Sequence, residues 1–269
     1  KLKQSLIFTT RDLLSKISNK QYLLINLLEA PVLALILAFI IKYKSSPFGD
    51  DYIFRFNDNI PAFMLMSIIV ALFMGLTVSA EEIIRDRKIL KRESFLNLSW
   101  NSYLMSKLFI LFLLSAIQTL TFVIIGNLIL EIHGMTFTFW FVLFSASCLA
   151  NVLGLNISSA FNSAVTVYVM IPLLLIPQMI LSGLLFSFDK LNDLISTKGE
   201  VPIVADFMAS RWAYEAMAVD QFKSNDYMEP YFDLKKKEAQ ADFLSAYMAR
   251  ELKKKREFIS ENLPAENDS

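Results

Sequence analysis

Four stretches of the chain are long, apolar and free of charged residues. They cover residues 61–80, 108–130, 136–155 and 165–187, and each holds at least 20 residues. A helix of 20 residues is about 30 Å long, which matches the hydrocarbon core of a bilayer. A fifth stretch, 22–41, has the same length and character except for one acid, Glu29. The sequence therefore predicts a polytopic integral membrane protein.

The segments that cross the lipid are expected to be helices. Inside a bilayer each backbone N–H and C=O must find a partner within the protein, which leaves only helices and closed barrels. Barrel strands alternate apolar and polar residues over about 10 positions, and none of the five runs alternates in this way. The fold class we expect is therefore all-α, a polytopic membrane domain with five spans.

Composition argues against several functions. The formal net charge of the chain is +0, which argues against a nucleic-acid partner. His133 is the only histidine and Cys148 the only cysteine, so we expect neither a metal centre nor an intrachain disulfide. No Gly-x-x-x-x-Gly-Lys-[Ser/Thr] phosphate-binding loop occurs. We therefore expect no ATP hydrolysis, no cofactor and no catalytic residue in this part of the chain.

Basic residues gather on one side of the predicted spans. They are Lys1, Lys3, Arg11, Lys16 and Lys20 before the first span, and Arg85, Arg87, Lys88, Lys91, Arg92 and Lys107 between the second and third. The turn 131–135 on the other side has none. Because cytoplasmic loops are enriched in Lys and Arg, we expect a cytoplasmic amino terminus and an extracytoplasmic segment 188–269. The alternative is a miscounted span that leaves this segment in the cytoplasm.

Two segments on the predicted cytoplasmic side are expected to be helical. In residues 1–21 one helical stripe is apolar and the opposite face is basic, which is typical of a connecting helix that lies in the membrane interface. In the loop 81–107, Glu82 and Asp86 are four residues apart, as are Arg87 and Lys91, so a helix would present faces of opposite sign. A solvated loop tolerates this composition, and so does a segment that receives force from a partner.

Four short motifs resemble one transporter family. Residues 86–93, Asp-Arg-Lys-Ile-Leu-Lys-Arg-Glu, resemble the acid-Arg-x-Ile-Phe-x-Arg-Glu stretch of the G-type (white-like) ATP-binding-cassette exporters. Residues 103–107, Tyr-Leu-Met-Ser-Lys, resemble the Tyr-x-x-Ser-Lys that begins their third span. Residues 181–185, Leu-Ser-Gly-Leu-Leu, resemble the Phe-Ser-Gly-Leu-Leu that closes their fifth span. Residues 211–216, Arg-Trp-Ala-Tyr-Glu-Ala, resemble their Arg-Tyr-Ala-x-Glu-Ala segment outside the membrane.

The resemblance implies an architecture and a way of working. The family fold has six spans, a short coupling helix after the second span, and re-entrant helices between the fifth and sixth, here about residues 201–222. It works as a homodimer in membrane lipid, with substrate held between the second and fifth spans. ATP and Mg bind an associated ATPase domain, in the same longer chain or a separate subunit. The nearest resemblance is to bacterial proteins that fuse the two halves, which implies the inner membrane.

The resemblance also assigns roles by position. The transmission segment that couples to the ATPase would contain Asp86, Arg87, Lys91, Arg92 and Glu93. The substrate cavity would be lined by Ala71 and Met74 on the second span and by Ile176 and Met179 on the fifth. Leu184 and Leu185 would form a hydrophobic plug between inner and outer cavities. For the apolar residues, ordinary helix packing or lipid contact explains the same side chains.

The chain departs from the family pattern in two respects. It contains no phosphate-binding loop, and after residue 187 no further run approaches 20 apolar residues. We therefore expect the ATPase module and the sixth span to lie elsewhere in a longer chain or in a partner. The segment 223–269 is longer than the family's usual loop, and about 233–262 is expected to form a charged amphipathic helix. It could be a lid, a spacer, or a dock for a periplasmic partner.

Glu29 is the one acid within a predicted span. An acid in this position costs roughly 2.5–3.5 kcal/mol on insertion scales and is a functional candidate by default. It lies about 10 Å along the first span, so it could instead reach headgroup water or the amide of Asn26. The two interpretations stay open.

Three functional hypotheses follow. The first is the permease half of an ATP-driven exporter that moves an amphipathic or lipidic solute outward by alternating access at a dimer interface. The second is a protein whose ATP-driven motion acts on a periplasmic partner without transport. The third is a secondary transporter, which would require charges or broken helices at mid-membrane, and Glu29 is its only support.

Overall fold

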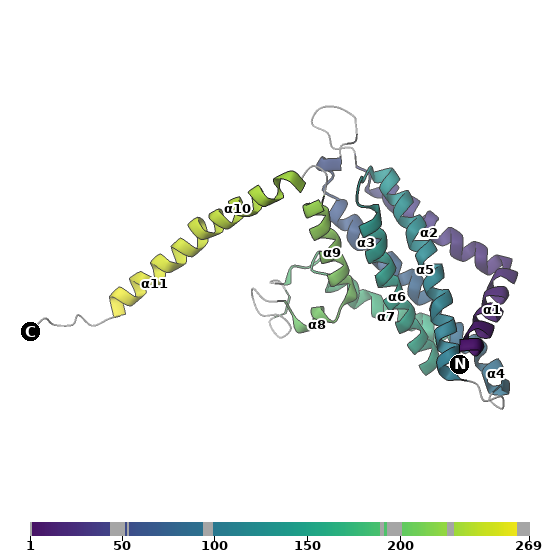
Figure 1. The fold of residues 1–269 in the computed structure, drawn as a ribbon. Helices are drawn as coiled ribbons and strands as arrows, with labels where there is room; N and C mark the ends of the chain where they lie inside the picture. Colours follow the sequence, from purple (N-terminus) through teal and green to yellow (C-terminus); the bar gives the residue numbers. More distant parts are fainter. Residues whose placement is uncertain are drawn as a thin grey trace, which may run out of the picture. The chain divides into compact units, whose positions relative to one another are not determined.

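The computed structural model describes residues 2–43, 52, 54–93, 99–188, 191–192, 201–224 and 229–262, and these are helical with short connections. Seven helices form the amino-terminal part: α1 (Leu2–Ser18), α2 (Lys20–Ile41), α3 (Ile60–Ala80), α4 (Glu82–Glu93), α5 (Trp100–Leu130), α6 (Thr136–Ala160) and α7 (Ala164–Ile180). Two shorter helices follow, α8 (Ile203–Asp206) and α9 (Ala209–Ser224). Figure 1 shows α2, α3, α5 and α6 as the long helices of a bundle.

Four helices in the described part of the chain are long and apolar enough to cross a membrane. They are α2, α3 with α4 following it, α5 and α6. The helix found at the expected fifth span, 165–187, is shorter than the apolar run, because α7 has 17 residues and ends at Ile180. The residues after Ile180 form turns, and Gly183 has a φ of +84°, a backbone conformation that ends a helix. The protein is an all-helical integral membrane protein, and the count of five spans stays a prediction.

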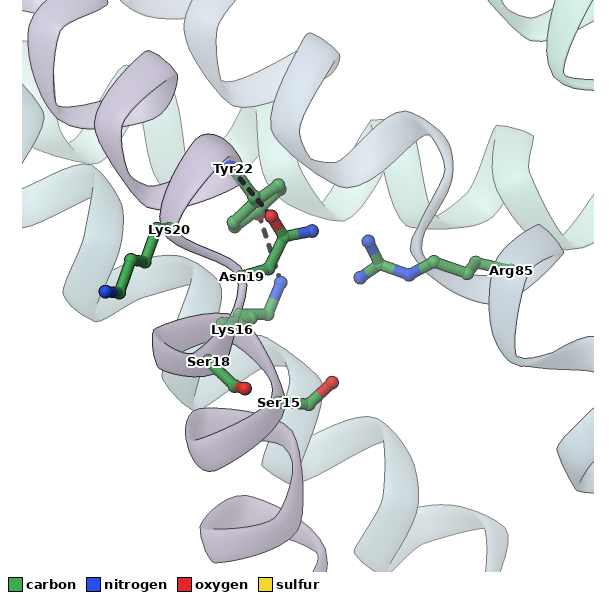
Figure 2. A pocket seen from close by; sticks show the side chains of 7 residues that line it. All are labelled: Ser15, Lys16, Ser18, Asn19, Lys20, Tyr22 and Arg85. Carbon is green, nitrogen blue, oxygen red and sulfur yellow. Dashed lines mark hydrogen bonds between the residues drawn. The ribbon is translucent and has the colours of Figure 1, made fainter.

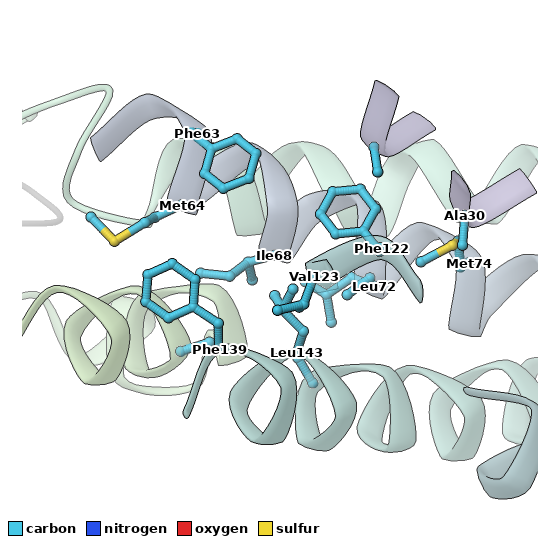
Figure 3. Close-up of a cluster of buried hydrophobic side chains, with 14 of the residues drawn as sticks. Ala30, Phe63, Met64, Ile68, Leu72, Met74, Phe122, Val123, Phe139 and Leu143 are labelled. Atoms are coloured by element: carbon cyan, nitrogen blue, oxygen red, sulfur yellow. The ribbon is translucent and has the colours of Figure 1, made fainter. Parts of the chain in front are cut away.

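The core of the bundle lies around α3. Side chains of α3 such as Phe63 and Ile68 meet Phe122 of α5 and Phe139 and Leu143 of α6 in one apolar cluster (Figure 3). The helix packs most extensively against α6 and also contacts α2, α5 and α7. A helix that is apolar around most of its circumference is suited to the centre of a membrane bundle. The core therefore forms where the second, third and fourth apolar runs meet.

Small residues allow α3 and α6 to approach closely. A Cβ atom added to Gly75 would lie 2.6 Å from the backbone oxygen of Ser147 and 2.8 Å from the Cβ of Ala150. At Gly154 an added Cβ would meet the Ser79 hydroxyl, which donates a hydrogen bond to the Gly75 carbonyl oxygen at 2.6 Å. Small residues at helix contacts let backbones come together in lipid, where packing rather than water exclusion drives association.

A second compact unit, residues Phe222–Ser269, follows the bundle. It contains α10 (Phe232–Asp242), a π-helical segment (Phe243–Met248) and α11 (Ala249–Asn262). Nearly all of its described side chains are exposed. The segment is therefore helical where the sequence predicts a charged amphipathic helix. In its described part, the apolar side chains do not form a buried core.

Replacing Gly75 with alanine should destabilise the bundle by about 1–3 kcal/mol, because the new methyl group meets backbone that cannot give way. The matched control is Gly126→Ala on α5. There the added Cβ lies 2.9 Å from the tip of the Phe63 ring, a side-chain atom rather than backbone, and alanine gains about 1 kcal/mol of helix propensity, so the loss should be smaller. Thermal unfolding of both purified variants in detergent checks this. Equal loss of stability would contradict the close α3–α6 contact.

Candidate functional site

The amino-terminal end of α4 is held by α6. A helix begins with backbone N–H groups that have no partner within the helix. In α4 the N–H groups of Ile83 and Ile84 donate to the hydroxyl of Ser158 at 3.1 and 3.3 Å. Ser158 is fully buried near the end of α6. The Ser158 side chain therefore caps α4, although it lies 75 residues from Ile83 in the sequence. This contact fixes where α4 begins.

Arg87 makes a reciprocal contact from α4 to the end of α6. Its Nη2 donates to the carbonyl oxygens of Phe161 at 2.9 Å, Ser159 at 3.1 Å and Ser158 at 3.3 Å. Its Nη1 donates to the side-chain oxygen of Asn162. The last carbonyls of a helix are unpaired and carry partial negative charge. The Arg87 guanidinium group thus caps the carboxyl end of α6, while Ser158 of α6 caps the amino end of α4.

Six charged side chains from three helices meet beside this contact. We call them the buried ion cluster; they are Asp12 and Lys16 of α1, Glu82, Arg85 and Asp86 of α4, and Lys107 of α5. Three are acids and three are bases, so the cluster is formally neutral. Charges can be taken out of water at tolerable cost only when they are paired and hydrogen-bonded.

Lys107 and Glu82 form the centre of the buried ion cluster. Their side chains are 2% and 1% exposed, and Nζ lies 2.9 Å from Oε2. The same Nζ is 2.7 Å from an oxygen of Asp12 and 2.7 Å from an oxygen of Asp86. The hydroxyl of Tyr103 donates to Asp86 at 3.0 Å. One ammonium group therefore ties α5 to both α1 and α4.

The other oxygen of Glu82 is shared by two further bases. Lys16 of α1 donates to Oε1 of Glu82, and Nη2 of Arg85 lies 3.0 Å from the same atom. Helix periodicity explains why these residues can meet: Glu82, Arg85 and Asp86 are three or four positions apart on α4, so they share one face. The polar face of α1 turns toward this cluster, while Leu6, Leu14 and Ile17 are exposed.

The residues predicted to transmit force separate into two groups. Asp86 and Arg87 belong to the contacts that hold α4 in place. Lys91 and Arg92 are exposed on α4, and the side chain of Glu93 lies outside the described residues. The structure therefore gives α4 one face that is fixed to the bundle and another that is open to a partner.

In the described part of the chain, the residues predicted to line a substrate cavity do not surround a common cavity. Ala71 and Met74 are each 1% exposed and belong to the apolar core. Ile176 and Leu185 are about half exposed, and Met179 and Leu184 are more buried. Their roles in a substrate cavity and plug stay predictions.

Glu29 lines two adjoining hollows beside α2. One, of about 320 Å³, also includes Asn26 and Thr77, and the other, of about 490 Å³, is otherwise apolar. The amide of Asn26 donates to the carbonyl of Tyr22 at 2.8 Å rather than to Glu29. In the described residues Glu29 has no hydrogen bond or ion pair. Its functional interpretation stays open.

Sequence reasoning missed the buried partners of α4. Lys16 and Lys107 were counted only as charges of segments outside the bilayer, and Glu82 only as part of a surface pattern. The signal that could have found them is the i, i+4 pair of opposite charge on α1 together with a lysine at the end of an apolar run. In the described part of the chain, no group of three His, Cys, Asp or Glu residues could hold a metal ion.

Comparison with known proteins gives one match. The family model described as ABC-2 type transporter matches residues 3–221, which is most of the chain. Neither the curated proteins nor the solved structures compared with the chain gave a match. The matched range includes α4 and all six members of the buried ion cluster.

Substituting Lys107 with methionine should lower the free energy of unfolding by about 3–5 kcal/mol, because it leaves buried carboxylates without their shared cation. The control is Lys42→Met. Lys42 pairs with Glu131 at 2.9 Å, but the side chains are 31% and 49% exposed, so its loss should cost at most about 1 kcal/mol. Denaturant unfolding of the two purified variants measures the difference. Similar losses in both would show that the cluster is not held as described.

Proposed function

Because the chain belongs to the ABC-2 type transporter family, we propose that it is the permease half of an ATP-driven exporter in which α4 receives the motion of the ATPase. The chain is a permease component of an ABC transporter, and such permease domains generally partner with an ABC ATPase. Export, the solute and the direction of force belong to the proposal. The observation that carries it is the attachment of α4 to three other helices.

The attachment favours transmission of force rather than a loose surface loop. Helix α4 follows α3 after one residue, bonds α6 through Ser158 and Arg87, and pairs with α1 and α5 through the buried ion cluster. Packed interiors transmit displacement because they deform little. A push on α4 therefore acts on α3 and α6, which pack together, and on α5.

The open face of α4 is suited to contact with the ATPase. Lys88, Lys91 and Arg92 are exposed on it, and the positive-inside rule predicts that this end of the bundle is cytoplasmic. In the proposal, ATP and Mg bind the associated ATPase domain, two copies of the permease form a homodimer in a bacterial inner membrane, and closure of the ATPases moves α4. Residues 188–269 lie outside the cytoplasm in this arrangement.

The proposed solute is amphipathic or lipidic. Large apolar side chains of α7, such as Val169, Leu173 and Ile176, are exposed in the single chain. In a dimer such a helix can face the partner and line an apolar path, which suits a solute with a substantial apolar part. Ala71 and Met74 would reach this path only if α3 turns or separates from α6 during transport.

The two alternatives make different predictions for the purified complete protein in vesicles. Action on a periplasmic partner through the helices α10 and α11 would give ATP hydrolysis without solute movement. A secondary transporter would move solute with an ion gradient alone and would depend on Glu29. ATP-dependent solute movement supports the exporter and contradicts both.

The double variant Lys91→Ala, Arg92→Ala should retain ATP hydrolysis but move about tenfold less solute per ATP, which is the effect of losing ~1.4 kcal/mol of coupling free energy. The physical reason is the loss of charged contacts on the open face of α4, which leaves the fixed face intact. Paired assays of ATP hydrolysis and solute uptake by inverted vesicles measure this ratio.

The matched control is Lys236→Ala, Lys237→Ala, which removes the same charge from exposed positions of α10. It should leave the ratio of solute to ATP unchanged. A wild-type ratio in the Lys91 and Arg92 variant would refute the role of this face, and an equal fall in the control would assign the effect to total charge.

A further inference from the structure

A polar cavity opens at the bend between α1 and α2. Its volume is about 690 Å³, and it is lined by Ser15, Lys16, Ser18, Asn19, Lys20, Tyr22 and Arg85. Every one of these side chains can donate a hydrogen bond, three are cationic, and none is acidic. A cavity with this lining is chemically suited to an anion, in particular to the several oxygens of a phosphate group.

The bend itself sets the shape of the cavity. Asn19 separates the two helices and accepts a hydrogen bond from the backbone N–H of Tyr22 at 3.1 Å. Lys16 Nζ donates to the hydroxyl of Tyr22 at 3.1 Å. Figure 2 shows the side chains of Lys16, Asn19 and Arg85 turned toward one space, with Lys20 on the other side of the bend. The donors therefore converge from α1, from the bend and from α4.

The positive charge of the cavity is not cancelled. Lys16 and Arg85 belong to the buried ion cluster, whose six charges balance one another, so the excess positive charge of the cavity comes from Lys20. Lys20 adds one charge that has no ion pair among the described residues. The side chain of Arg85 is 47% exposed, and only its Nη2 contacts Glu82. The remaining N–H groups of Arg85 can therefore donate to a ligand.

The surroundings of the cavity suggest that the anion belongs to a lipid. Leu6, Leu14 and Ile17 of α1 are exposed, as expected for a helix lying at the membrane surface with its apolar side in the lipid. The cavity shares Tyr22 and Arg85 with the 320 Å³ hollow, which is lined by the acids Glu29, Glu81 and Glu82 as well as by apolar side chains, and the apolar hollow along α2 adjoins it. A headgroup in the cavity would thus have apolar surface for its chains nearby.

We propose that this cavity binds the phosphate group of an anionic phospholipid headgroup. Basic pockets beside transmembrane helices recognise such headgroups by charge and hydrogen bonding. The bound phosphate bridges α1, the start of α2 and α4, and it contacts the same Lys16 and Arg85 that hold Glu82. Lipid at this position would therefore brace the coupling helix. The inference does not rest on transport, so it is tested by binding alone.

The test is native mass spectrometry of the intact protein titrated with dioleoyl phosphatidylglycerol, and separately with dioleoyl phosphatidylcholine. The wild type should bind the anionic lipid at least about tenfold more tightly. The variant Ser18→Glu, Lys20→Gln places an acid in the cavity and removes a base from it, without changing any member of the buried ion cluster. It should lose this preference. Should the double variant fail to fold, Lys20→Gln alone must weaken binding severalfold.

The control Thr10→Glu, Lys236→Gln makes the same change in net charge at exposed positions outside the cavity, and it should bind as the wild type does. Equal binding of the two lipids, or equal loss in the control, would overturn the proposal. A further arm adds inorganic phosphate at millimolar concentration. Full displacement of the lipid by free phosphate would overturn assignment to a lipid headgroup, whereas persistence of lipid binding supports it.

Discussion

The structure depends on the pairing of Lys107 with Glu82 at the contact between α4 and α5. Both side chains are almost completely buried, and a charge in such a place is tolerated only while its partners stay within contact distance. Asp12, Lys16, Arg85 and Asp86 complete the pairing. Moving one of the three helices away from the others would expose the remaining charges to a low-dielectric surrounding. The cluster therefore penalises relative motion of α1, α4 and α5.

A second set of contacts joins this unit to the core. Ser158 and Arg87 close the facing ends of α4 and α6, and α6 packs closely on α3 through Gly75 and Gly154. In the described residues, helix α4 of this ABC transporter permease is therefore fixed to the long helices by direct contacts. The cavity at the bend of α1 lies against the same unit, which is why occupancy by an anionic lipid would act on it.

The sequence predicts the long helices well because bilayer thickness fixes the length of an apolar run. It does not predict where α7 ends, since the positive φ of Gly183 follows from the turn in which it lies. It also misses the buried ion cluster. Lys16 and Glu82 are 66 residues apart, and Lys107 is 25 residues from Glu82, so only tertiary packing decides that these charges are buried rather than solvated. For Ala71 and Met74 the resemblance to the family predicts a position in a substrate cavity, whereas in the single chain both side chains lie in the packed core.

The central claim is that α1 and α4 move as one body, and a distance between them tests it most directly. Spin labels at Ser15→Cys and Lys88→Cys, in intact protein with Cys148→Ser, report this distance by pulsed electron paramagnetic resonance. The account predicts the same narrow distribution without nucleotide and with ATP trapped at the associated ATPase. A nucleotide-dependent shift or broadening between these two labels would contradict it.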